Sequence, residues 1–223
     1  MNIKKFCLTL FSVLAILLVF KVNALESKAY YDIDNDLNIP KGGEFVYKDY
    51  IYRVVKTHKY RPEVEIVGLV PVPYKQDRRY LGIDDIEEEY GYKVVGIADN
   101  AFKDNQEIVS FFAESKYLRY IGKSAFEGCT NFRYFYDNGG VTTIKSRAFY
   151  GCKSLRSIEL VHDRLKRVGK DAFRGTKKKF TVITDNMSKG YAPKVLKKLK
   201  KAGAKRIKLK MHFYKEYKGD PCH

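Results

Sequence analysis

The chain lacks tryptophan and has only three methionines, four cysteines and four histidines among its 223 residues. The histidines lie far apart, and none belongs to a spacing such as H-E-x-x-H, which places two imidazoles on one helical face for a metal. No serine stands in the G-x-S-x-G context that exposes a nucleophile on a strand-to-helix turn. Because no acid, base and nucleophile converge in a readable motif, we expect no enzymatic activity, no cofactor and no bound metal.

Long apolar runs are also absent, with one exception at the N-terminus. Residues 6–20 form a mostly apolar run that follows two lysines, and a small-residue pattern ending at Ala24 suits a signal-peptidase cut. The run is shorter than the roughly 20 residues of a membrane-spanning helix. We therefore expect a signal peptide over 1–24, a poorly ordered leader over 25–43, and a secreted or cell-surface protein. The alternative is an uncleaved membrane anchor.

Acidic residues are scarce in the C-terminal part of the chain. Residues 174–218 carry 16 basic side chains and two acidic ones, whereas residues 26–173 carry 24 basic and 23 acidic side chains. The formal net charge of +17 is therefore concentrated in one block, and such a block attracts polyanions through interactions that salt weakens. The alternative is a lysine-rich face that only keeps this end soluble. The predicted polyanion-binding residues are Lys197, Lys198, Lys200, Lys201, Lys205, Arg206, Lys208 and Lys210.

One phrase recurs along the chain. In IGKSAFEGC at 121–129, Gly-Lys-Ser resembles the end of a phosphate-binding loop, but Tyr117 stands where that loop needs its first glycine. The phrase returns as IKSRAFYGC at 144–152 and as VGKDAFRGT at 168–176, and neither copy keeps the Lys-Ser pair directly before Ala-Phe. The phrase is therefore a structural repeat and not a nucleotide site.

Four Ala-Phe pairs mark four units spaced 23 to 24 residues apart, at Phe102, Phe126, Phe149 and Phe173. Apolar residues recur five and eight positions before each phenylalanine and about six and nine positions after it. A unit of this size cannot close a core alone, so it stacks on its neighbours. The chain is expected to turn at each Ala-Phe pair, which we call a corner. The alternating segment after each corner, such as SLRSIEL at 154–160, predicts one strand per unit. Stacking these strands predicts a parallel sheet on one wall.

The phrase resembles the BspA-like bacterial leucine-rich repeat family, whose pattern I-G-x-x-A-F-x-G-C-x-x-L-x-x-I-x-L is matched nearly letter for letter at 121–129 and 144–160. The resemblance covers 83–185. It implies an α/β repeat solenoid, a right-handed leucine-rich-repeat coil, that is exported or surface-displayed and binds proteins or cell-surface components. Asp137 departs from the pattern where the strand should be apolar, so we expect an irregular rung at 130–140.

The segments on either side of the repeats suit the caps that a solenoid needs for solubility. Aromatic and β-branched runs over 44–55 and 64–70 predict antiparallel strands in a β-rich N-terminal cap spanning 44–82, with a loop over 71–82. At the other end, residues 186–223 predict a basic C-terminal cap made of a helix followed by a strand.

Cysteine usage excludes a scaffold of several disulfides, because the three cysteines that follow the predicted signal peptide are an odd number. Cys129 and Cys152 occupy the same column in adjacent units, where the other two units have asparagine and threonine. A bridge between them is conceivable. A small core position accounts for all four residues, however, so we expect free buried thiols.

The repeat strands supply a second candidate site. In leucine-rich geometry, alternate residues of each strand point outward from the sheet, among them Phe112, Tyr134, Tyr136 and Glu159. An exposed aromatic cluster marks a binding surface. The alternatives are shielding by the N-terminal segment and ordinary packing across strands.

The sequence thus predicts a secreted or cell-surface, non-catalytic module that binds a protein or surface polymer through the repeat sheet. The alternative is an electrostatic anchor to anionic wall or membrane surfaces, sulfated glycans or extracellular DNA. In that case the basic C-terminal cap makes the contact and the repeats act as a spacer. Neither hypothesis involves recognition of a specific nucleic-acid sequence.

Overall fold

The computed structural model describes residues 30–33, 38–71, 77–83, 86–113, 115–137, 140–160, 164–177, 179–185 and 191–212. The predicted signal peptide lies outside these residues, as do residues 25–29 and 34–37 of the predicted leader. Within the described part of the chain, no helix is both long and apolar enough to cross a membrane.

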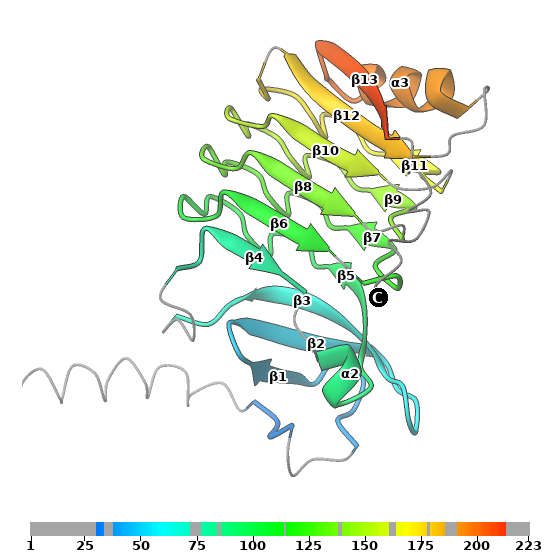
Figure 1. Ribbon diagram of the computed structural model, residues 1–223. Coiled ribbons are helices and arrows are strands. Elements are labelled where there is room, and N and C mark those ends of the chain that lie inside the picture. Colours follow the sequence, from blue (N-terminus) through cyan, green and yellow to red (C-terminus); the bar gives the residue numbers. More distant parts are fainter. Residues whose placement is uncertain are drawn as a thin grey trace, which may run out of the picture.

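The repeats stack as rungs, one rung per unit, with a sheet on each of two walls (Figure 1). The six-stranded sheet is parallel throughout, in the order β4 (Tyr80–Gly82), β6 (Ser110–Ala113), β8 (Tyr134–Asp137), β10 (Ser157–Leu160), β12 (Lys179–Asp185) and β13 (Arg206–His212). The seven-stranded sheet has the order β1 (Glu44–Tyr47), β2 (Tyr50–Lys56), β3 (Glu63–Leu69), β5 (Lys93–Ile97), β7 (Tyr120–Ile121), β9 (Thr143–Ile144) and β11 (Arg167–Val168). In the described part of the chain, the helices α2 (Ile86–Glu89) and α3 (Tyr191–Lys201) flank the rungs.

This architecture confirms the predicted repeat solenoid with parallel strands, and it adds a second sheet on the opposite wall. Each rung contributes one strand to each wall, for example β7 and then β8. Strands β7, β9 and β11 have only two residues each, which is too short to show alternation in a sequence. In the sequence, their inward residues Ile121 and Ile144 stand out only as the apolar column five positions before each phenylalanine.

The N-terminal cap contributes strands to both sheets. Strands β1, β2 and β3 pair antiparallel, as expected, and β3 then pairs parallel with β5. The loop predicted over 71–82 is wrong at its end, because Tyr80–Gly82 forms β4 and pairs with β6. This strand is too short to alternate visibly. It is held in place by buried Leu81 and by the Tyr50 hydroxyl, which donates to the Gly82 carbonyl at 2.5 Å.

Helix α2 connects this cap to the rungs through two glutamates. Glu87 accepts hydrogen bonds from the Ser115 hydroxyl and, at 3.2 Å, from the Val94 N–H. Burial raises the pKa of Glu87, and these two hydrogen bonds oppose that rise. Glu89 accepts a 2.5 Å hydrogen bond from the Tyr47 hydroxyl of β1. The acidic turn therefore ties the antiparallel strands to the first repeats.

Each Ala-Phe corner has a fixed backbone conformation with a positive φ two residues before and two residues after the phenylalanine. The residues before it have φ from 55° to 62° and are Asn100, Ser124, Arg147 and Asp171. The residues after it have φ from 58° to 76° and are Asp104, Gly128, Gly151 and Gly175. A non-glycine residue in this region costs roughly 1–2 kcal/mol. The position two residues before the phenylalanine varies in sequence, because the units share its backbone conformation and not its side chain.

A ladder of backbone hydrogen bonds joins these corners. The N–H groups of Phe102, Phe126 and Phe149 donate to the carbonyl of the alanine one unit later, each at 2.8 Å. In the last rung, Phe173 donates at 2.9 Å to Ala202, which follows α3 and stands in for a fifth repeat alanine. The C-terminal cap therefore continues the ladder of the repeats.

The interior is a column of stacked phenylalanine rings. The centroids of Phe102 and Phe126 lie 5.1 Å apart, and those of Phe126, Phe149 and Phe173 follow at 5.3 Å intervals. The column continues to Phe180 at 5.6 Å. Such stacking adds about 0.5–1.5 kcal/mol per pair beyond the burial of the rings.

Cys129 and Cys152 are free and buried beside this column, which confirms the prediction. Their Sγ atoms donate to the carbonyls of Phe102 at 2.9 Å and Phe126 at 3.0 Å. Burial raises the pKa of Cys129 to about 12 and moves the pKa of Cys152 well above its ordinary value. Both therefore remain protonated core thiols.

The irregular rung expected at Asp137 is wrong. Asp137 is buried, and its carboxylate accepts the backbone N–H groups of Gly140 and Val141, each at 3.1 Å. Strand β8 keeps regular register with β6 and β10 along its whole length. The carboxylate satisfies the turn after the strand, so a charged residue fits where the pattern has an apolar one.

Two glycines of the corners provide a first prediction. A Cβ at Gly122 would lie 2.4 Å from the Ala98 carbonyl carbon, whereas a Cβ at Gly151, where φ is 72°, meets nothing closer than 3.8 Å. We expect Gly151→Ala to lower the free energy of unfolding by roughly 1–2 kcal/mol through backbone strain alone. Gly122→Ala forces two rungs apart, and we expect it to cost about 3 kcal/mol or more. Denaturant unfolding of both variants measures this, and equal losses would contradict the proposed rung contact.

A salt bridge between two corners provides a second prediction. Arg147 donates to Glu127 through Nε at 2.8 Å and stacks on Tyr150, with Cζ 3.9 Å from the ring centroid. The hydrogen bonds from Arg147 are the main reason that the pKa of Glu127 falls from 4.5 to about 2.

Because the pKa of Glu127 is depressed in the folded state, the pair stabilises the fold above pH 4.5, and that stability is lost as the pH falls toward 2. We expect a loss of about 1 kcal/mol, since solvent screens the partly exposed arginine. Glu127→Gln should flatten this acid limb in unfolding experiments across pH. The exposed Glu88→Gln on α2 serves as the control, and the same flattening there would contradict the assignment.

Candidate binding surfaces

The outward face of the six-stranded sheet carries a row of aromatic side chains. Tyr80, Phe112 and Tyr134 are 57%, 41% and 39% exposed, which is unusual for rings on adjacent strands. Phe112 lies in register with half-buried Tyr136, and their ring centroids are 6.3 Å apart. We call Tyr80, Phe112, Tyr134 and Tyr136 the aromatic face. All of these except Tyr80 were predicted from the sequence, and Tyr80 lay in the segment expected to be a loop.

The same face becomes basic toward the C-terminal end of the stack. On β13, Arg206, Lys208 and Lys210 are exposed and alternate with the inward-facing Ile207 and Leu209. Partly exposed Glu159 lies between the two regions, because β10 pairs with β8 on one side and with β12 on the other. Three of the predicted polyanion-binding residues therefore share one sheet face with the predicted aromatic residues.

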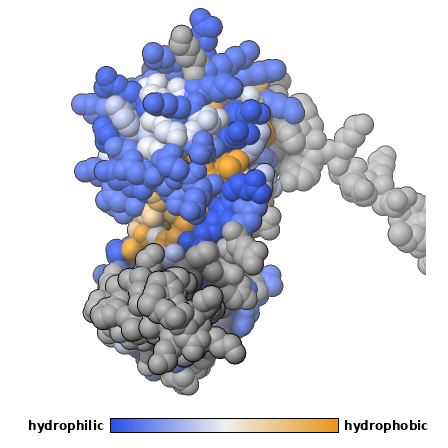
Figure 2. Space-filling model, turned by 90° about the vertical axis from the view of Figure 1, so that its left-hand side faces the viewer, coloured by the Kyte–Doolittle hydropathy of each residue, from blue (hydrophilic) through white to orange (hydrophobic). Residues whose placement is uncertain are grey.

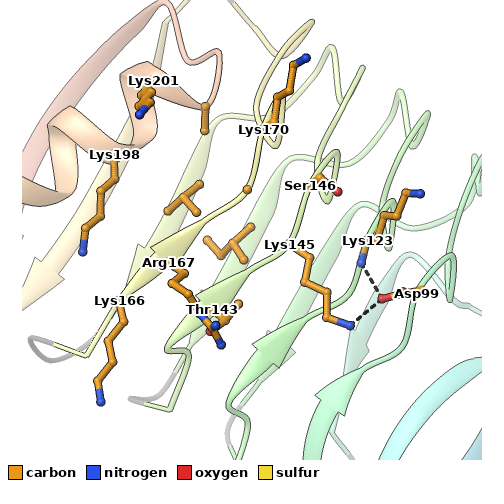
Figure 3. A pocket seen from close by; sticks show the side chains of 14 residues that line it. Asp99, Lys123, Thr143, Lys145, Ser146, Lys166, Arg167, Lys170, Lys198 and Lys201 are labelled. Atoms are coloured by element: carbon orange, nitrogen blue, oxygen red, sulfur yellow. Dashed lines mark hydrogen bonds and ion pairs between the residues drawn. The ribbon is translucent and has the colours of Figure 1, made fainter.

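The eight predicted cations do not form one patch. Lys197, Lys200 and Lys205 are exposed on α3 or just after it. Lys198 and Lys201 line a groove on the other wall, together with cations of the repeats (Figure 3). Sequence order placed these residues together, whereas the turn from α3 into β13 separates them.

This groove has a volume of about 1000 Å³ and lies between the end of α3 and the strands β9 and β11. The repeats contribute the cations Lys123, Lys145, Lys166, Arg167 and Lys170. We call it the cationic groove. Sequence reasoning missed it because its cations come from four separate stretches of the chain.

One carboxylate stands at the far end of the cationic groove. Asp99 accepts hydrogen bonds from Lys145 Nζ at 2.9 Å and from the Lys123 N–H at 2.8 Å (Figure 3). Burial alone would raise its pKa, but these contacts prevail and lower it. At the opposite end, Lys198 Nζ donates to the Leu165 carbonyl at 2.9 Å. Both ends of the groove thus hold lysines fixed by hydrogen bonds.

Among the described residues, no three or more histidine, cysteine, aspartate or glutamate side chains gather where they would hold a metal ion. Figure 2 shows that one side of the molecule is largely hydrophilic, with apolar areas confined to smaller patches. The described surface thus carries an aromatic and basic sheet face on one wall and a cationic groove on the other.

Stacked rungs with a parallel sheet and a repeated Ala-Phe corner define a leucine-rich-repeat solenoid. Residues 88–191 match the family model described as the BspA type leucine rich repeat region, in six copies. The chain carries BspA-type leucine-rich repeats, as its sequence resemblance indicated. Repeat proteins of this kind are typically non-catalytic and act by binding.

Solved leucine-rich repeat proteins resemble the chain at low identity. One from Bacteroides ovatus ATCC 8483 is 24% identical with a TM-score of 0.43, and the match covers 55% of this chain and 29% of that protein. One from Bacteroides capillosus ATCC 29799 is 16% identical with a TM-score of 0.44, over 67% of this chain and 99% of that one. The T. pallidum leucine-rich repeat protein is 16% identical with a TM-score of 0.34, over 60% and 87%. No curated protein matches the sequence.

Proposed function

We propose that the protein is a secreted or cell-surface binding module that recognises a protein partner through the outward face of its six-stranded sheet. The observation that carries this proposal is the exposure of Tyr80, Phe112 and Tyr134 on three adjacent strands. The apolar run over 6–20 supports export, because it follows two lysines and precedes a small-residue pattern at Ala24, as in a signal peptide.

Aromatic side chains suit this role because they offer a large contact area with few rotatable bonds. Residues that dominate binding energy are enriched in tyrosine, tryptophan and arginine. Here Phe112, Tyr134 and Tyr136 project from β6 and β8, which are paired on both sides, so little conformational freedom remains to be lost on binding. The aromatic face is a preorganised platform.

The chemistry of the partner follows from the change of character along the face. Aromatic side chains of β4, β6 and β8 give way to Arg206, Lys208 and Lys210 on β13. A complementary segment has apolar residues at one end and acidic residues at the other. Five gaps of about 4.8 Å between strands make the face about 24 Å wide, which suits a single segment better than a broad interface.

Attachment to anionic polymers is a second candidate function. The C-terminal cations are split between two walls, so the site of this attachment is not the C-terminal cap alone. Lys198 and Lys201 join repeat cations in the cationic groove, on the other wall from Arg206, Lys208 and Lys210.

Capture of partners from the envelope fraction of the producing organism tests the proposed function. The double variant Phe112→Ala, Tyr136→Ala should weaken binding of the captured partner by roughly 10- to 100-fold, as loss of two central rings does. Tyr60→Ala is the matched control, because Tyr60 is 68% exposed on the loop between β2 and β3 and lies off the face.

The thermal midpoints of both variants should stay close to that of the parent protein, because the altered side chains are partly exposed. Equal weakening by Tyr60→Ala would contradict recognition through the aromatic face. So would unchanged capture by the double variant. A large fall in its thermal midpoint would show that the rings serve packing between strands.

A further inference from the structure

We propose that the cationic groove is a second binding site, for a linear polysaccharide that carries sulfate or phosphate groups. It lies on the seven-stranded sheet, opposite the aromatic face, and the proposal does not depend on recognition of a protein there. The residues that line it include seven cationic side chains and one carboxylate.

The arrangement of these cations favours a linear ligand that lies along the stack. Lys123 and Lys170 occupy the same position of their units two rungs apart, with Ser146 between them. Rungs are about 4.8 Å apart, so the groove extends over roughly 15–20 Å from the rung of Asp99 to α3. Charges repeated along one axis match an anion that repeats along a chain.

The excess of seven cations over one carboxylate favours a strongly charged group such as sulfate or phosphate. Lysine outnumbers arginine six to one in the groove. Lysine binds phosphate as a point charge, without the fixed two-pronged geometry that a guanidinium offers to phosphates and carboxylates, so a row of lysines suits strongly charged groups that change orientation along a chain. Lys198 is held by the Leu165 carbonyl, and an ammonium has three donors, so the same side chain still has donors for a ligand.

The floor of the groove separates a polysaccharide from other polyanions. It is formed by aliphatic and small residues, including Ile144, Val168 and Ala202, and the described lining contains no aromatic ring. Single-stranded nucleic acids are bound by stacking bases on aromatic side chains, which this site does not offer. Hydroxyls of Thr143 and Ser146 stand among the cations and can bond to sugar hydroxyls.

Two triple variants that remove the same charge test the site. The groove triple is Lys166→Gln, Arg167→Gln, Lys201→Gln, which alters both sides of the groove. The control triple is Arg206→Gln, Lys208→Gln, Lys210→Gln, on the opposite wall. All six side chains are exposed, so both variants should fold, and thermal unfolding checks this.

Titration calorimetry at several salt concentrations would use heparin as the sulfated probe and a phosphorylated mannan as the phosphate-bearing probe. We expect the groove triple to bind at least one probe about 10- to 100-fold more weakly, and the slope of log affinity against log salt to fall by about three. The control triple should change the affinity by less than about threefold. The probe that binds more tightly identifies the anionic group.

Equal losses in the two triples would overturn the proposal, because they would show a response to net charge alone. Unchanged binding by the groove triple would also overturn it. A single-stranded oligonucleotide and vesicles of anionic lipid are the further ligands. If either binds more tightly than both polysaccharides and loses affinity in the groove triple, the groove serves that ligand and the polysaccharide assignment is wrong.

Discussion

The backbone hydrogen bond from each corner phenylalanine to the alanine of the next unit is the contact on which the rest of the structure depends. It requires positive φ on both sides of the Ala-Phe pair, and it brings neighbouring corners close enough for Phe102, Phe126, Phe149 and Phe173 to stack. The conformational free energy that the positive-φ residues cost is offset in every rung by one backbone hydrogen bond and one contact between phenylalanine rings. The rest of each unit then has only to pair its two strands with those above and below.

This arrangement converts positions in a repeat into rows on a surface. Side chains at one position of successive units line up along the stack, so an outward tyrosine or lysine in several units becomes a continuous face. Phe112 and Tyr136 form one such row, and Lys123, Ser146 and Lys170 form another on a different wall. A solenoid with two sheet walls can thus present chemically different surfaces without any change in its interior.

The rungs could be predicted because the inward columns are apolar in every unit. Strand β4 and the two-residue strands of the second sheet could not, because alternation needs more residues than they have. Asp137 was misleading, since its backbone partners Gly140 and Val141 are visible only in the folded turn. The aromatic face followed from alternation, apart from Tyr80. The cationic groove did not, because Asp99, Arg167 and Lys201 are brought together only by stacking.

Native-state hydrogen exchange at the amides of Phe102, Phe126, Phe149 and Phe173 tests the central claim most directly. If the corner ladder holds the stack together, all four amides should exchange slowly and with similar opening free energies, close to that of global unfolding. The Phe173 amide should match the others, because Ala202 continues the ladder beyond the last repeat. Fast exchange at any one of them, while its neighbours remain protected, would contradict the account.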